Sequence, residues 1–105
     1  MRTFKCTVTR ETTMDITIDD SVWTDEEIEE WSKHFQDADD LEELVERLAA
    51  MKVRYEDGQF MEGFGIPLID GKKPYSYLDN NQVEESINIR NQEESIDVDV
   101  EEITY

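Results

Sequence analysis

The 105-residue chain contains only one cysteine, Cys6, so it cannot form an internal disulfide. Cys6 alternates with Phe4 and Val8, which predicts a buried structural thiol. No apolar stretch reaches the length that spans a membrane, and the N-terminal MRTFKCTVTR lacks the apolar core of a signal peptide. We therefore expect an intracellular, cytoplasmic protein with no membrane partner.

Basic residues are scarce, because ten lysines and arginines oppose 28 aspartates and glutamates, for a formal net charge of −18. Such a charge repels nucleic acid and anionic lipid, so direct binding to either is disfavoured and a basic partner is favoured. The charge is unevenly placed: residues 11–46 carry −14 and 84–105 carry −7, whereas 1–10 carry +3 and 47–83 are balanced. Two acidic blocks flanking a neutral middle are the clearest functional feature of the sequence.

Hydrophobic residues are also few, at 37% of the chain, where globular proteins usually have about 45–50%. Two tryptophans, four tyrosines and four phenylalanines nevertheless indicate a folded chain rather than a disordered one. A length of 105 residues predicts a single domain over 1–105.

Apolar and polar residues alternate near the N-terminus, in 3–10 and again in 13–19, which predicts two strands joined as a hairpin. Two helices are predicted next. Thr24 and Glu27 form a capping box before a stripe of Ile28, Trp31 and Phe35. The second helix is predicted from Asp39 or Asp40 to near Gly58, with this buried stripe: Leu41, Leu44, Val45, Leu48, Met51 and Tyr55.

The dipeptide Asp70-Gly71 predicts a further hairpin with arms at 66–69 and 72–78. Because Pro67 and Pro74 cannot donate hydrogen bonds, these arms are expected to be edge strands or irregular segments. A last hairpin is expected to place Ile87 and Ile89 against the following apolar positions: Ile96, Val98 and Val100. The fold class is therefore α+β, with an antiparallel sheet of about four to six strands in ββ-αα-ββ-ββ order and a two-helix hairpin on one face.

No motif for catalysis, metal binding or a cofactor is evident. The single histidine, His34, lies between Lys33 and Phe35 without an acid–base partner and is interpreted as a surface helix residue. EGFGIP lacks the third glycine of a phosphate-binding loop, and DADDLE lacks the glycine of a calcium loop. The chain is therefore predicted not to be an enzyme and to need no cofactor. A small metal-dependent enzyme is the weakest of three functional hypotheses, and the other two are given below.

The stretch SIDVDVEEI, residues 95–103, alternates strictly between apolar and acidic residues. A strand there is expected to have one apolar side that joins the core and, on the other side, a row of carboxylates about 6.8 Å apart. On the helices only Glu29 has a lysine four residues away, Lys33, whereas a salt-bridged surface would have several such pairs. The net charge also far exceeds the magnitude of about 2–8 that suffices for solubility. Ordered carboxylates can imitate a phosphate backbone and bind the basic groove of a nucleic-acid-binding protein. The expected contact residues are Glu26, Glu29, Glu30, Glu42, Glu43, Glu46, Asp97, Asp99 and Glu101.

The combination of FKCTVTR, DITIDDSVWTDEEIEEWSKHF, EGFG, DGK followed by proline, and DVDVEEI resembles short acidic proteins from phages and conjugative elements of bacteria. Small acidic proteins of such elements include anti-CRISPR and antirestriction inhibitors, several of which look like DNA to their targets. The resemblance implies a non-enzymatic inhibitor of a CRISPR nuclease or restriction system in the bacterial host cell. It carries over no site residues.

A second hypothesis is a general protein-interaction or assembly module that uses the neutral part of the chain. Its anchors would be Phe60, Phe64, Tyr75 and Tyr77, since exposed aromatic clusters often form interface hot spots. Ordinary sheet packing is the competing interpretation of these four residues. The sequence leaves open whether the chain forms a homodimer.

Overall fold

The computed structural model describes residues 1–104 and has an α+β architecture with three strands and two helices. A short 3-10 turn, η1, precedes the last strand. The elements in chain order are β1 (Thr3–Ile18), α1 (Asp25–His34), α2 (Leu41–Lys52), β2 (Ile66–Ile69), η1 (Asn80–Gln82) and β3 (Val83–Ile103). The predicted fold class is confirmed at this level, whereas the predicted four to six strands are not found among the described residues.

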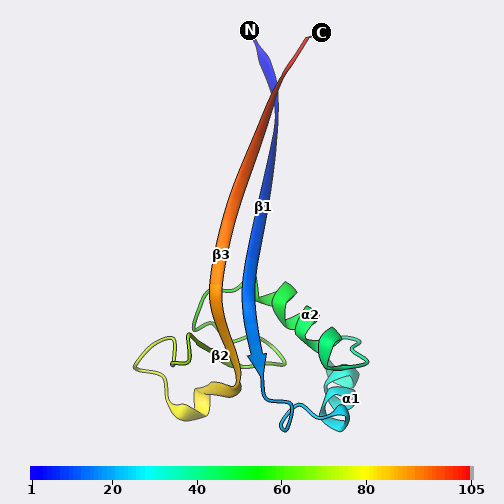
Figure 1. The fold of residues 1–105 in the computed structure, drawn as a ribbon, viewed down its shortest axis with the longest axis vertical. Helices are drawn as coiled ribbons and strands as arrows, with labels where there is room; N and C mark the ends of the chain where they lie inside the picture. The colour runs from blue at the N-terminus through cyan, green and yellow to red at the C-terminus, as the bar shows by residue number, and fades with distance from the viewer. Residues whose placement is uncertain (105) are drawn as a thin grey trace.

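The long strand β1 pairs along its whole length with the greater part of β3 in antiparallel fashion, from Thr3 opposite Ile103 to Ile18 opposite Ile87. They form a two-stranded ribbon that projects from a base containing the helices, with both chain ends at its tip (Figure 1). The molecule is therefore elongated, 59 Å along its longest axis, with a radius of gyration of 18.3 Å against about 13 Å for a compact chain of this length.

Both terminal hairpins predicted from the sequence are wrong, because each supposed hairpin is one continuous strand. In β1, residues 10–13 contain no glycine, asparagine or proline that would favour a turn, so the backbone stays extended. In β3, the place of the turn is taken by a β-bulge. Asn91 has a left-handed φ of 54°, its side-chain amide donates to Asp15 at 2.7 Å, and the register shifts between Thr13 and Asp15.

The third strand, β2, pairs with β3 in parallel, so the sheet is mixed with the order β1-β3-β2 and not purely antiparallel as predicted. Pro67 lies in this edge strand, as predicted. Asp70 and Gly71 do form the predicted tight turn, with φ of 53° and 80° and a backbone hydrogen bond between Ile69 and Lys72. The second predicted arm, 72–78, is not a strand; Pro74 within it has no N–H to donate.

Both helices begin where the sequence predicts. The Thr24 hydroxyl accepts from the Glu27 amide at 3.3 Å, and the Asp40 carboxylate accepts from the Glu43 amide at 2.8 Å. However, α2 ends at Lys52 rather than near Gly58. The buried Lys52 ammonium donates to the Tyr55 carbonyl at 3.1 Å and pairs with Asp57, which fixes a turn directly after the helix.

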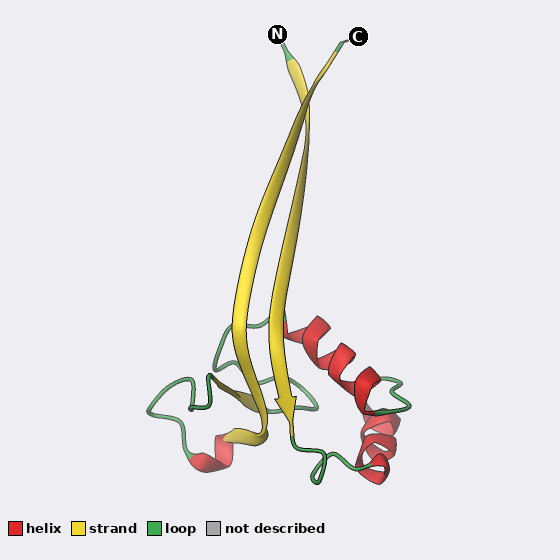
Figure 2. Cartoon of the chain, in the orientation of Figure 1, coloured by secondary structure: helices red, strands yellow, loops and turns green. Residues whose placement is uncertain are grey.

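The hydrophobic core lies entirely in the base, where the buried stripes of the two helices meet the lower parts of β1 and β3 (Figure 2). The members of its main cluster that are fully or nearly buried are Ile28, Trp31, Ala38, Leu44, Leu48, Met61, Phe64, Ile87 and Ile89. A smaller buried cluster consists of Ile66, Leu78 and Val83. Above the base, every residue in 1–13 and 90–102 is exposed. The ribbon is therefore an arm that presents both of its faces to solvent.

Candidate protein-binding surface

Three carboxylates that the sequence indicated, Asp97, Asp99 and Glu101, lie on one face of the upper ribbon, because alternate residues of β3 point to the same side. All three are exposed. In the antiparallel register Asp97 is opposite Thr9 and Asp99 is opposite Thr7, so neither is opposite a positive charge. Only Glu101 has a basic residue across from it, Lys5.

Two further acids, Glu11 and Glu93, lie on the same face, opposite Ser95 and Thr13 respectively. Sequence reasoning missed them because it placed both residues in or beside turns. Recognising 3–18 and 83–103 as single paired strands would have found them. We define the acidic face as Glu11, Glu93, Asp97, Asp99 and Glu101.

The opposite side of the upper ribbon is apolar and is not buried, contrary to the prediction that it joins the core. Exposed fractions are 62% for Ile96, 58% for Val98 and 61% for Val100. Cys6 is exposed as well, so the prediction of a buried thiol is wrong. The reason is that the helices reach only the lower ribbon (Figure 1). We define the apolar face as Phe4, Cys6, Val8, Ile96, Val98 and Val100.

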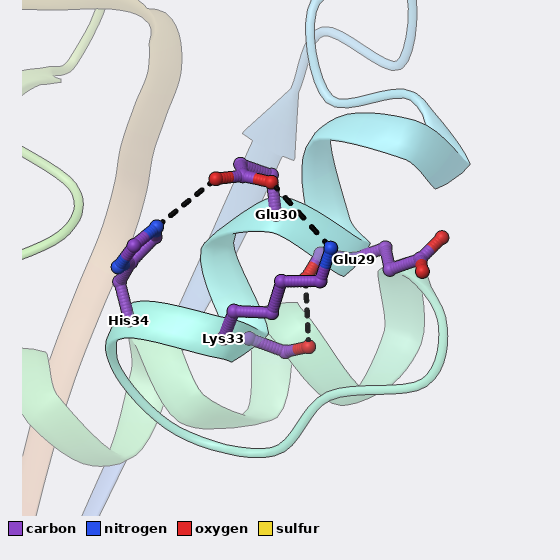
Figure 3. Close-up of polar contacts among 5 residues, drawn as sticks. Glu29, Glu30, Lys33 and His34 are labelled. Atoms are coloured by element: carbon purple, nitrogen blue, oxygen red, sulfur yellow. Dashed lines mark hydrogen bonds and ion pairs between the residues drawn. The ribbon is translucent and has the colours of Figure 1, made fainter.

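On α1, the three predicted contact residues differ in their surroundings. Glu26 and Glu29 are exposed, and Figure 3 shows the Glu29 side chain extending away from its neighbours. Glu30 instead accepts from His34 Nε2 at 3.0 Å and lies 3.8 Å from Lys33 Nζ (Figure 3). Glu30 is therefore partly neutralised within its own helix.

The hydrogen bond from His34, followed by the positive charge of Lys33, lowers the pKa of Glu30 below its ordinary value of 4.5. Since the pKa is lower in the folded state, this contact stabilises the fold above pH 4.5 and loses that contribution as the pH falls through the lowered value. We expect His34→Ala to raise the Glu30 pKa toward 4.5 in a carboxyl NMR titration. As a control, Ser32→Ala removes only a hydroxyl that donates to the Glu29 carbonyl and should leave the Glu30 pKa unchanged.

On α2, Glu42 and Glu46 are exposed, whereas Glu43 is half-buried and has a structural role. The Glu43 carboxylate accepts from the Asp39 amide at 2.7 Å, while its own amide donates to Asp40. This reciprocal contact satisfies amides at the start of the helix that would otherwise have no partner. Glu43 is therefore better explained as a helix cap than as a contact residue.

The structure does not bring the nine predicted acids together on one surface. The helical acids belong to the base, whereas Asp97 lies eight positions beyond Ile89, the last buried residue of β3. Eight strand positions correspond to about 27 Å along the ribbon. The sequence could not show this separation, because it depends on how far the ribbon projects.

The four aromatic residues of the interaction-module hypothesis differ in their burial. Phe64 is 2% exposed and packs between Trp23 and Trp31, so its proposed surface role is wrong. Tyr75 and Tyr77 are exposed and their rings stack at 5.4 Å. Phe60 is 64% exposed.

Among residues 1–104, no three His, Cys, Asp or Glu side chains are placed to hold a metal ion. His34 and its partner Glu30 lie on the exposed surface of α1 rather than in a cavity. In the same part of the chain, neither helix has the length and apolarity needed to cross a bilayer.

Comparison with known proteins found no matching family model, no matching curated protein and no matching solved structure.

Proposed function

We propose that the chain is a non-enzymatic inhibitor whose acidic face enters the basic groove of a host nucleic-acid-binding enzyme, in the class of CRISPR nucleases and restriction enzymes. The observation that carries this proposal is the position of the acidic face on a projecting ribbon. Its carboxylates are exposed and regularly spaced, and four of the five stand opposite neutral residues. The resemblance to acidic proteins of phages and mobile elements supports the same function.

The geometry of the ribbon suits a groove that normally holds a phosphate backbone. Asp97, Asp99 and Glu101 are about 6.8 Å apart along β3, which is twice the 3.4 Å axial spacing of phosphates on one DNA strand. A paired strand also holds its side chains in fixed directions, unlike an acidic tail. Lysines and arginines that line a nucleic-acid groove would therefore meet an ordered series of negative charges.

The exposed acids of the base have a supporting role in this proposal. Residues 14–92 hold 21 of the 28 acidic residues and seven of the ten basic ones, a formal charge of −14. A charge of this size attracts a basic partner over distances of about a Debye length and raises the association rate. The direct contacts are assigned to the ribbon, because a projecting arm can enter a groove that the wider base cannot.

The test is a triple neutralisation, Asp97→Asn, Asp99→Asn and Glu101→Gln, assayed for inhibition of DNA cleavage by a panel of purified CRISPR nucleases and restriction enzymes. For the enzymes that the wild-type protein inhibits, we expect the inhibition constant to rise at least about 100-fold, since three charged contacts at roughly 1 kcal/mol or more each are lost. Inhibition should also weaken between about 50 and 200 mM salt.

The matched control is Glu29→Gln, Glu42→Gln and Glu46→Gln, which removes three charges from exposed helical positions. It should change the inhibition constant much less. Equal losses for the two triple variants would show that only net charge matters and would contradict contact through the ribbon. Absence of inhibition throughout the panel, or inhibition that does not respond to salt, would contradict the proposed mechanism.

The second candidate function, a protein-interaction module, is favoured by one observation, the exposed stack of Tyr75 and Tyr77. Stacked tyrosines that face solvent are typical interface anchors. Tyr77→Ala distinguishes the two functions, because Tyr77 is 77% exposed and its loss should not disturb the fold. The variant should keep full inhibition if the acidic face acts and should lose activity if the tyrosine stack does.

A further inference from the structure

The apolar face of the ribbon is a regular, exposed series of hydrophobic side chains. Phe4 is 46% exposed, and Val8 and Ile96 are each 62% exposed. An isolated two-stranded ribbon is only marginally stable in water, and independent stability normally requires a hydrophobic face that is covered. A stable arm therefore calls for a partner on this face.

The charges that border the apolar face are arranged symmetrically. Arg2, directly before β1, lies over the Phe4 ring on this side, and it is followed along β1 by three uncharged residues and then Arg10. Along β3 the residues on this side are Glu94, three aliphatic residues and then Glu102. Arg2 pairs with Glu102 at 2.7 Å, and Arg10 pairs with Glu94. Each of the two strands therefore shows the same order of charges when it is read from either end, and one ion pair lies at each end of the apolar face.

This pattern is self-complementary. A second copy turned end over end presents the same series of charges, so that each end of a face-to-face pair would contain two arginines and two glutamates with no net charge. The acids of the acidic face all point away from such a contact. In this orientation the two bases, each with a formal charge of −14 over residues 14–92, lie at opposite ends and repel each other least.

We propose that the apolar face binds a second copy of the chain, with the two ribbons packed face to face and antiparallel. The contact includes the charged residues that border the apolar face, so from Arg2 to Thr12 it is about 34 Å long, and two strands make it about 10 Å wide. Two such surfaces in contact bury roughly 800–1,000 Å² in total, which is below the roughly 1,200 Å² of a stable interface and in the size range of weak, transient ones. The dimer is therefore expected to have a Kd in the micromolar range.

This proposal does not depend on the proposed inhibition, because it concerns the other side of the ribbon and its test needs no target. Sedimentation equilibrium of the full chain should show a monomer–dimer equilibrium over about 1–500 μM. Val8→Lys puts a charge into the centre of the apolar face and should raise the dimer Kd at least about tenfold, because the two copies bring two lysines together in an apolar contact.

The matched control is Thr9→Lys, one residue further along β1 but on the acidic face and opposite Asp97. Both variants change the net charge by the same amount, from −18 to −17. The control should therefore dimerise at least as well as the wild-type chain. Equal weakening by both substitutions, or a wild-type chain that remains monomeric at 500 μM, would overturn the proposal.

A second measurement uses the native cysteine and does not rely on how a variant folds. Cys6 lies in the middle of the apolar face, so a short bismaleimide should link two wild-type chains efficiently. In the double variant Cys6→Ser and Thr7→Cys, the thiol moves to the opposite side of the ribbon and linking should fall at least about tenfold. Equal linking from both positions would indicate contact between ribbon edges and would overturn the face-to-face arrangement.

Discussion

Replacing Ile87 by alanine is expected to lower the free energy of unfolding by about 2–5 kcal/mol. Ile87 is 0% exposed and belongs to the core cluster, where the lower part of β3 packs with the helices. A small domain has a total stability of about 5–15 kcal/mol, so this loss leaves a protein close to unfolding. Urea unfolding followed by the fluorescence of Trp23 and Trp31 measures it, since both indoles pack in the base.

The chain offers a matched control in the same strand. Ile96→Ala makes the same chemical change on β3, but Ile96 is 62% exposed on the apolar face. In dilute protein it should cost less than about 1 kcal/mol, because little apolar surface returns to water. A cost for Ile96→Ala that approaches that of Ile87→Ala in dilute solution would mean that the apolar face is packed within a single chain.

Gly63→Ala is expected to destabilise the fold strongly. Gly63 has a φ of +89°, and a Cβ there would lie 2.7 Å from Trp31 Nε1 and 3.1 Å from the Phe35 ring. The Gly63 carbonyl also accepts a hydrogen bond from the Trp31 indole at 2.9 Å. Backbone strain of about 1–2 kcal/mol adds to the displacement of a core tryptophan and a weakened hydrogen bond. We expect a loss of about 3–5 kcal/mol in urea unfolding.

Gly65→Ala separates the two contributions to this loss. Gly65 lies in the same loop with a similar φ of +81°, but a Cβ there would meet only Glu84, at an ordinary 3.4 Å. It should therefore cost only the backbone strain of about 1–2 kcal/mol. If Gly63→Ala cost no more than Gly65→Ala, the close packing of Trp31 on the Gly63 backbone would be contradicted.

The features that the sequence predicted correctly are those determined by neighbouring residues. The caps at Thr24 and Asp40, the turn at Asp70-Gly71 and the helical stripe that contains Leu44 and Leu48 all depend on residues a few positions apart. The position of Pro67 on an edge strand follows equally directly from its missing N–H. Such short-range chemistry can be recognised without knowledge of the tertiary structure.

The ribbon could not be recognised in this way, because its pairing joins the two ends of the chain. In the sequence, the apolar residues have odd numbers up to Ile89 and even numbers from Ile96 onward. A turn between them is the simpler explanation of this change. The structure shows a bulge at Asn91 instead, which inserts one residue and moves every later side chain of β3 to the other side. A hairpin and a bulge leave the same local pattern.

For the candidate contact residues, too, the sequence predicted what depends on neighbouring residues and missed what depends on the tertiary structure. Alternation alone placed Asp97, Asp99 and Glu101 on one exposed face, and the structure agrees. The sequence pattern could not show that Glu43 caps a helix, that Glu30 is paired with His34, or that the apolar side of the strand is not covered by other residues. Those facts depend on side-chain geometry and on where the core ends.

The pairing of Thr3 with Ile103 also determines the order in which the molecule assembles. Residues 100 positions apart in the chain must meet, and the entropic cost of closing so long a loop is large unless the intervening segment has already become compact. The base should therefore form first and bring the lower parts of β1 and β3 together. The remaining residue pairs of the ribbon should then form in order toward its free end.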